Sequence, residues 1–166
     1  MINLQQLPET VEHRVIELVR QRVRDAFKLS DANAQRFNGS NGPVADNSVP
    51  ADAYAVVSPH DSDFDDDSPA DIEDFELPLS IDLHLVTVPA GSDLTDIAER
   101  AIGLLHQALL QDPKWTDPAT QAELATDTVV KGRFRPTAHP GQDDPTCGVD
   151  VVITTRHAFG EPFTPA

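Results

Sequence analysis

The densest group of potential metal ligands in the chain is a run of aspartates. Its members are Asp61, Asp63, Asp65, Asp66 and Asp67. An EF-hand calcium loop needs oxygen ligands at positions 1, 3, 5 and 12 and a glycine at position 6. Counted from Asp61, position 6 is Asp66 and position 12 is Ile72, so the run is not an EF-hand. Three interpretations remain open: a solvated acidic loop, a weak divalent site of another kind, or a recognition surface.

Positive charge is scarce and gathers in two segments, the first of which is a predicted strand over residues 128–135. Alternation along this strand places the basic side chains Lys131, Arg133 and Arg135 on one face. The other face then carries Val130, Gly132 and Phe134. The second basic segment is the predicted N-terminal helix, whose polar face includes Arg20 and Arg24.

These cations have two interpretations. They either pair with local carboxylates or form a basic edge that meets the acidic surface of a neighbouring subunit. Under the second interpretation the candidate interface residues are Arg20, Arg24, Lys131, Arg133 and Arg135.

The other reactive residue types form no catalytic pattern. The six histidines lack metal-site spacing, and there is no Gly-x-Ser-x-Gly motif or glycine-rich phosphate loop. A single cysteine, Cys147, excludes an internal disulfide and a multi-cysteine zinc site. We expect it to be a small buried hydrophobic residue. The sequence therefore predicts no enzyme, no cofactor and no metal.

The overall charge is strongly negative. The chain has 28 acidic and 12 basic residues, a net charge of −16. Such a surface repels nucleic acid and anionic membranes, so we expect no sequence-specific nucleic-acid binding and no membrane association. Excess aspartate with almost no lysine is typical of proteins that work in high salt. The alternative is an ordinary acidic protein with one acidic loop.

Length and hydropathy indicate one soluble domain. A chain of 166 residues is most simply a single domain spanning residues 1–166. We expect no secretory signal and no membrane span, because no basic segment precedes an apolar run and no apolar stretch reaches 18 residues. Synthesis in the cytoplasm follows as an expectation.

Hydrophobic periodicity predicts the elements. A helix is expected over residues 8–28, and a second runs from an N-cap at Ser92 to a point before Pro113. Strands are expected over 53–58, 77–88 (with a bulge near Leu85), 128–135 and 147–156, and a short helix over 118–125. Residues 30–51 and the acidic segment 60–76 are expected to be long loops, and the tail from Gly160 extended.

This order predicts an α+β fold in which an antiparallel sheet of about four strands is flanked by two main helices.

Three segments carry a resemblance to a known family. They are ELPLSIDLHLVTV at 76–88, GSDLTDIA at 91–98 and CGVDVVITTR at 147–156. With the long N-terminal helix, this pattern resembles the tail terminator (tail completion) proteins of tailed viruses. The acidic insertion at 60–76 departs from a minimal member. The family has no invariant catalytic signature to match.

The resemblance implies a structural virion protein of the neck, assembled in the host cytoplasm. Such a protein forms a ring, typically a homohexamer, that ends the tail tube and joins it to the head connector or adaptor protein. DNA would pass through the ring, and the acidic run would face the bore. The composition would then indicate a virus of a halophilic archaeon.

Other functions compatible with the sequence are a different neck protein (an adaptor or head-completion component), an acidic DNA mimic, and a cellular domain adapted to salt.

Overall fold

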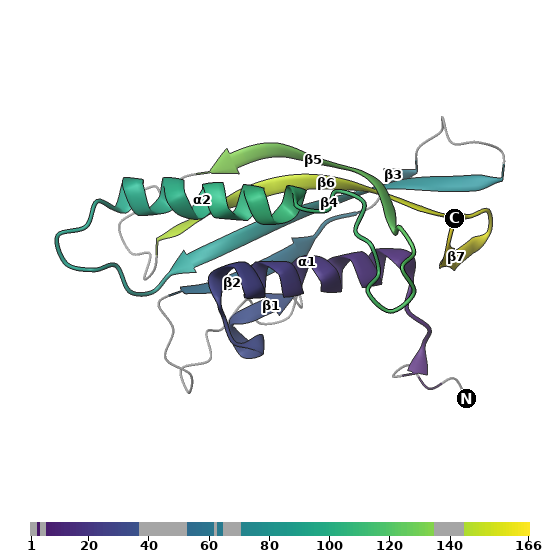
Figure 1. Ribbon diagram of the computed structural model, residues 1–166, viewed down its shortest axis with the longest axis horizontal. Coiled ribbons are helices and arrows are strands. Elements are labelled where there is room, and N and C mark those ends of the chain that lie inside the picture. Colours follow the sequence, from purple (N-terminus) through teal and green to yellow (C-terminus); the bar gives the residue numbers. More distant parts are fainter. Residues whose placement is uncertain (1–2, 4–5, 37–52, 62, 65–70, 135–144) are drawn as a thin grey trace.

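The computed structural model describes residues 3, 6–36, 53–61, 63–64, 71–134 and 145–166. Two helices, α1 (Val11–Phe27) and α2 (Leu94–Leu110), lie side by side on one face of a curled sheet (Figure 1). The predicted α+β class with two main helices is therefore confirmed. The prediction of a short helix at 118–125 is wrong, because this segment forms turns and a β-bridge between Thr116 and Glu123.

The sheet has more strands than the sequence predicts and is mixed. Its path is β1-β2-β4-β6-β5, with β3 pairing with β4 and β7 pairing with β6. The bounds are β1 (Ala34–Arg36), β2 (Ala53–Pro59), β3 (Asp63–Phe64), β4 (Ile72–Leu85), β5 (Ala125–Phe134), β6 (Thr146–Ala158) and β7 (Glu161–Pro165). The β1–β2 pair is parallel and the others are antiparallel. A purely antiparallel sheet of four strands is thus wrong, since β1, β3 and β7 are too short to show a period of two.

Helix α1 is held by its caps and its buried stripe. The Thr10 side chain accepts a hydrogen bond from the His13 amide at 3.1 Å, so the helix begins at Val11, three residues later than predicted. Lys28 ends it in a left-handed conformation with φ 53°. The side chains at spacings of four, Val11, Val15, Val19 and Val23, are fully buried.

Helix α2 begins one residue later than predicted. Its N-cap is Asp93, whose Oδ1 accepts from the Thr95 amide at 2.9 Å, rather than Ser92. A carboxylate at this position is favoured because it also meets the positive end of the helix dipole. Ile102, Leu105 and Leu109 face the sheet and are buried.

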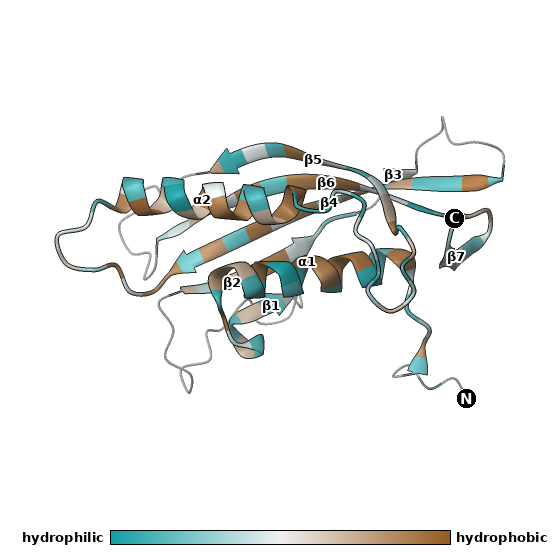
Figure 2. Cartoon of the chain, viewed as in Figure 1, coloured by the Kyte–Doolittle hydropathy of each residue, from teal (hydrophilic) through white to brown (hydrophobic). Residues whose placement is uncertain are grey.

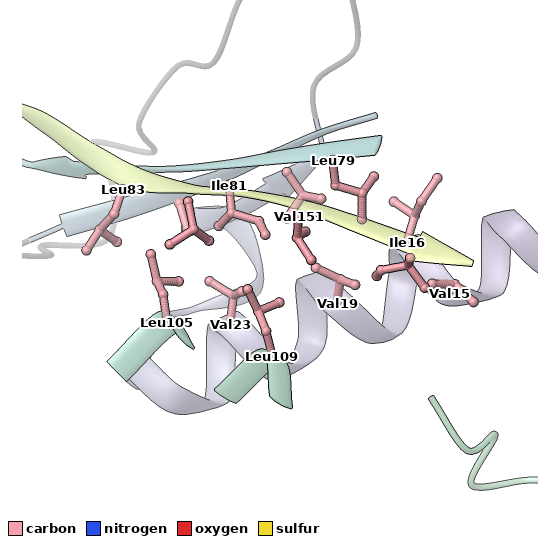
Figure 3. Packing of buried hydrophobic residues seen from close by; sticks show 14 of the residues in the cluster. Val15, Ile16, Val19, Val23, Leu79, Ile81, Leu83, Leu105, Leu109 and Val151 are labelled. Carbon is pink, nitrogen blue, oxygen red and sulfur yellow. The ribbon is translucent and has the colours of Figure 1, made fainter. Parts of the chain in front are cut away.

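The core lies between the helices and the sheet (Figure 3). Val19 of α1 and Leu105 and Leu109 of α2 point toward Ile81 of β4 and Val151 of β6 (Figure 3). Both helices carry apolar and polar residues interleaved along their length (Figure 2), and the buried apolar side chains of each belong to the core. Few aromatic residues are needed, since β-branched side chains fill the layer.

Strand β4 is longer at its start and shorter at its end than predicted. It begins at Ile72, inside the segment expected to be an acidic loop. One of its acids is neutralised across the strand pair: Arg156 donates two hydrogen bonds of 2.7 Å to Asp74. A local sequence window cannot see such a partner 82 residues away. The strand ends at Leu85, so the change of parity there marks a strand end and not the predicted bulge.

The connection from α2 to β5 is anchored by a buried tryptophan. Trp115 is fully buried, lies 3.8 Å beneath the Arg22 guanidinium and donates a 2.8 Å hydrogen bond to Thr128. The backbone at Trp115 has a φ of 52°, which is uncommon for a large residue. Burial of the ring, its hydrogen bond and the cation–π contact together hold this conformation.

Gly148 is the closest backbone approach in the sheet. A Cβ at this position would lie 2.0 Å from the Ile81 carbonyl oxygen and 2.5 Å from the ring of Phe134. Phe134 pairs with Gly148 in register, so its ring covers the space that a side chain would occupy. Only glycine fits here.

We predict that Gly148→Ala lowers the free energy of unfolding by at least about 1–3 kcal/mol. The Ile81 carbonyl group, which the new methyl would meet, is part of the backbone and cannot move aside. Gly103→Ala is the matched control: nothing lies within 4 Å of the added methyl, and the helix should gain about 1 kcal/mol. Denaturant unfolding at constant salt measures both. Equal stability of Gly148→Ala and the wild type would contradict the close approach.

Cys147 is buried in the core, as predicted, and burial raises the pKa of its thiol to about 11. We predict that the native thiol does not react with a thiol reagent at pH 8, since the thiolate is scarce and shielded. In denaturant one equivalent should react at once. Fast labelling of the native protein would show that this end of β6 opens.

Candidate interaction surfaces

The two candidate arginines of α1 are engaged within the subunit. Arg20 donates to Glu17 at 3.0 Å and to the Ala34 carbonyl oxygen at 3.0 Å. Arg24 donates to Asp25 at 2.9 Å and also pairs with Asp31, and its hydrogen bond lowers the pKa of the Asp31 carboxyl. The structure therefore favours local pairing for Arg20 and Arg24, the first interpretation that the sequence left open.

The basic residues of β5 lie at the free edge of the sheet. Lys131 and Arg133 are both exposed, and Arg133 contacts His106 of α2. A register shift falls between Val130 and Gly132, so Val130 and Arg133 lie opposite Val151 and Val149 on the helix side.

The shift breaks the alternation that the sequence suggested. Gly132 and Phe134 pair with Asp150 and Gly148 on the other side of the sheet, so Val130 does not share their face. Arg135 lies outside the described residues.

The acidic run is only partly described. Asp61 is exposed, and Asp63 belongs to β3, where it pairs with Glu76 in register. Asp65, Asp66 and Asp67 lie outside the described residues. Among the residues that the structure does describe, no group of three or more metal-ligating side chains is placed to hold a metal ion.

The face of the sheet opposite the helices carries a polar cluster that sequence reasoning missed. His60 Nε2 lies 2.9 Å from Ser80 Oγ, which donates to Asp150 at 2.7 Å. Asp82, two residues after Ser80 in β4, lies on the same face. His84 follows on that face and stacks on Tyr54, with the ring centroids 4.4 Å apart. We call His60, Ser80, Asp82, His84 and Asp150 the open-face cluster.

The open-face cluster does not have the order of a hydrolytic triad. In a triad the histidine lies between the serine and the carboxylate and takes the serine proton. Here Ser80 lies between His60 and Asp150: its hydroxyl donates a hydrogen bond to the Asp150 carboxylate, and no described carboxylate is hydrogen-bonded to the His60 imidazole. The geometry gives no support to a serine hydrolase.

The signal for this cluster was present in the sequence only in part. Ser80, Asp82 and His84 are the polar half of the alternation in β4, so they had to share a face. The neighbours of these residues in β6 and in the chain after β2 are set by the register of strand pairing. The spacing of residues along one strand does not reveal that register.

Asp82 is the electrostatically strained member of the open-face cluster. Burial raises the pKa of its carboxyl, and the negative charge of Asp150 adds to the rise, while His84 and His60 oppose it. The ionised form of Asp82 is therefore a cost to the folded state.

The helix side has a different character. A groove of about 670 Å³ runs between α1 and α2 and is lined by Leu18, Gln21, Arg22, Asp25, Ala26, Ala108, Gln111 and Asp112. A neighbouring hollow of about 540 Å³ shares Ala26 and Ala108 and is bordered by Leu104 and Leu110. These two leucines are 36% and 38% exposed, so the outer helix surface is partly apolar.

The chain matches no protein family model, and a search of curated proteins finds no match for it. Neither of the two helices described has the length and apolar character that crossing a membrane requires. Function must therefore be inferred from the geometry of the surfaces.

We predict that Asp82→Asn raises the free energy of unfolding at pH 7. A carboxyl whose pKa is raised on folding binds its proton more tightly in the folded state, so wild-type stability falls as the pH rises through the unfolded and then the folded pKa. The amide removes this loss, and the advantage of the variant should shrink as the pH is lowered. Denaturant unfolding across pH measures it, with the exposed Asp71→Asn as control. A variant that is less stable than wild type at pH 7 would contradict the assignment.

Proposed function

We propose that this protein is a structural subunit of a virion neck, of the kind that forms a ring at the end of a tail tube and joins it to the head connector. The carrying segments of that resemblance fold into β4, the start of α2 and β6, which lie together in one unit. They form the centre of the sheet and the helix that follows it.

The observation that carries the proposal is the unlike chemistry of the two sides of the subunit. One side presents the α1–α2 groove with Leu104 and Leu110, and the opposite side presents the open-face cluster. In a ring each subunit contacts its two neighbours through different surfaces, because the contacts are head-to-tail. A subunit with two dissimilar sides is suited to such contacts.

Several observations make the alternatives less suitable. A DNA mimic needs free carboxylates at regular spacing on rigid elements, whereas Asp31, Asp74 and Asp112 are bound to arginines of the same chain. Catalysis is not favoured, because the open-face cluster lacks the triad order. A different neck protein, an adaptor or head-completion component, fits the same two-sided subunit. Only the protein that it binds distinguishes it from a tail terminator.

The proposed host environment is one of high salt, and the proposed location is the neck of the virion. Lys131 and Arg133 remain candidates for contacts with an acidic neighbour. The tail tube protein and the head connector are the proposed partners, and DNA passing through the ring would be repelled by the net charge of −16.

We predict that the purified protein in molar salt, with or without magnesium, forms closed rings of about six copies, since cyclic symmetry closes head-to-tail contacts. Light scattering gives the mass and negative-stain imaging the shape. Leu110→Asp should reduce the mass toward one subunit, because it places a charge on the helix side. Phe159→Asp, at a 66% exposed phenylalanine in the turn between β6 and β7 that belongs to neither the α1–α2 groove nor the open-face cluster, is the control and should leave the mass unchanged.

A single-subunit mass in every condition would call for a second measurement, namely binding to the tail tube protein encoded in the same genome. If the protein forms no ring and does not bind the tail tube protein, the proposed function is wrong. Binding to the portal instead of the tube would assign the chain to the adaptors.

A further inference from the structure

Strand β5 is the long edge of the sheet, with no other described strand on its outer side. It stands at the end of the path β1-β2-β4-β6-β5, on the outer side of β6 (Figure 1). The opposite edge is β1, which has only three residues. A free edge of ten residues presents unpaired backbone donors and acceptors to the same edge of a second copy.

The pairing of β5 with β6 is interrupted at one residue in the middle of the strand. Val130 lies opposite Val151 and Gly132 lies opposite Asp150, so Lys131 is an extra residue with no partner in β6. Such a bulge twists a strand and disturbs the spacing of its outer backbone groups. A second shift falls between Ala125 and Asp127, which leaves two short stretches, Asp127–Val130 and Gly132–Phe134, in regular register.

The inserted residue is itself one that discourages pairing. Lys131 is exposed, and within the described part of the chain it forms no ion pair. Two copies pairing through β5 in antiparallel fashion would bring two Lys131 side chains to the same edge. Lysine on an edge strand and a bulge in it are two of the devices that keep natural sheets from joining edge to edge.

Molar salt makes the geometry of this edge more important. The net charge of −16 keeps copies apart in dilute buffer, but at about 1 M salt the screening length is only about 3 Å. Long-range repulsion then no longer prevents two edges from meeting. Only features of the edge itself still do so.

We propose that the bulge at Lys131 prevents the β5 edge from pairing with the β5 edge of a second copy. Contacts between copies are then made by side chains and not by a continuous sheet. This inference does not depend on the proposed function, because an unguarded edge would join copies of any protein with this fold.

The test is deletion of Lys131, which removes the bulge without reversing any other side chain. In the deleted chain Val130 is followed by Gly132, and these two already lie opposite Val151 and Asp150, which are adjacent in β6. The strand becomes regular. In molar salt we expect the mass by light scattering to exceed the wild-type mass and to rise with concentration, whether the wild type is a single subunit or a ring, because each β5 edge can then pair with the edge of another copy.

Two further variants separate the bulge from the charge. Lys131→Val keeps the extra residue and removes the charge, and it should associate less than the deletion but more than the wild type. Lys114→Val removes an exposed lysine that precedes β5 and pairs with Glu123 instead of standing within the strand, and should leave the mass at the wild-type value. Circular dichroism and the melting temperature establish that each variant is folded.

A folded deletion variant whose mass equals that of the wild type at every concentration would overturn the proposal. Where the deletion does not fold, Lys131→Val and hydrogen exchange on the wild type decide. The outward amides of β5 should exchange rapidly at all concentrations. Protection that grows with concentration would mean that the edge already pairs between copies, and the proposal would be wrong.

Discussion

The pairing of β4 with β6 is the interaction on which the rest of the fold depends. It runs without a break from Ile72 opposite Ala158 to His84 opposite Thr146. Because side chains alternate across a strand, one register puts the apolar series Leu77–Leu85 of β4 and Val149, Val151 and Ile153 of β6 on the helix side, and Ser80, Asp82, His84 and Asp150 on the other. A slip of one residue would expose Ile81 and Val151 and bury Asp82. Both the core and the open-face cluster are therefore consequences of one register.

The same pairing explains which parts of the structure follow from local sequence. The valines of α1 and the alternation Leu77–Leu85 are strong periodic signals, so both helices and the two long strands could be predicted. The start of β4 could not, because Glu73 and Asp74 are tolerated in a strand only through His157 and Arg156 of β6. Likewise β1 is a strand because β2 lies beside it, and three residues carry no period.

Interface prediction was limited by a similar cause. Arg20 and Arg24 have one carboxylate partner each that is near in sequence, Glu17 and Asp25, but the sequence does not show that the turn after α1 also brings Asp31 beside both arginines. On β5 a single extra residue changes the faces that alternation assigns, so Arg133 lies on the helix side, where it meets His106. Bulges have no clear sequence signal in a strand of this length. The charge pattern of the sequence therefore shows how many basic residues there are, but not which of them can contact a neighbouring subunit.

The arginine–carboxylate pairs within the subunit also affect how so acidic a chain can contact other copies of itself. Most of its arginines are bound to carboxylates of the same subunit, so positive charge available to neighbours is rare among the described residues. In molar salt, moreover, attraction between exposed charges is weak, since screening acts on attraction and repulsion alike. Stable contacts between copies must then come from apolar surface such as that around Leu104 and Leu110, whose burial does not weaken with added salt. A guarded edge at β5 and an apolar helix side would together direct association to side-chain surfaces, which permits a closed ring and disfavours an open-ended sheet.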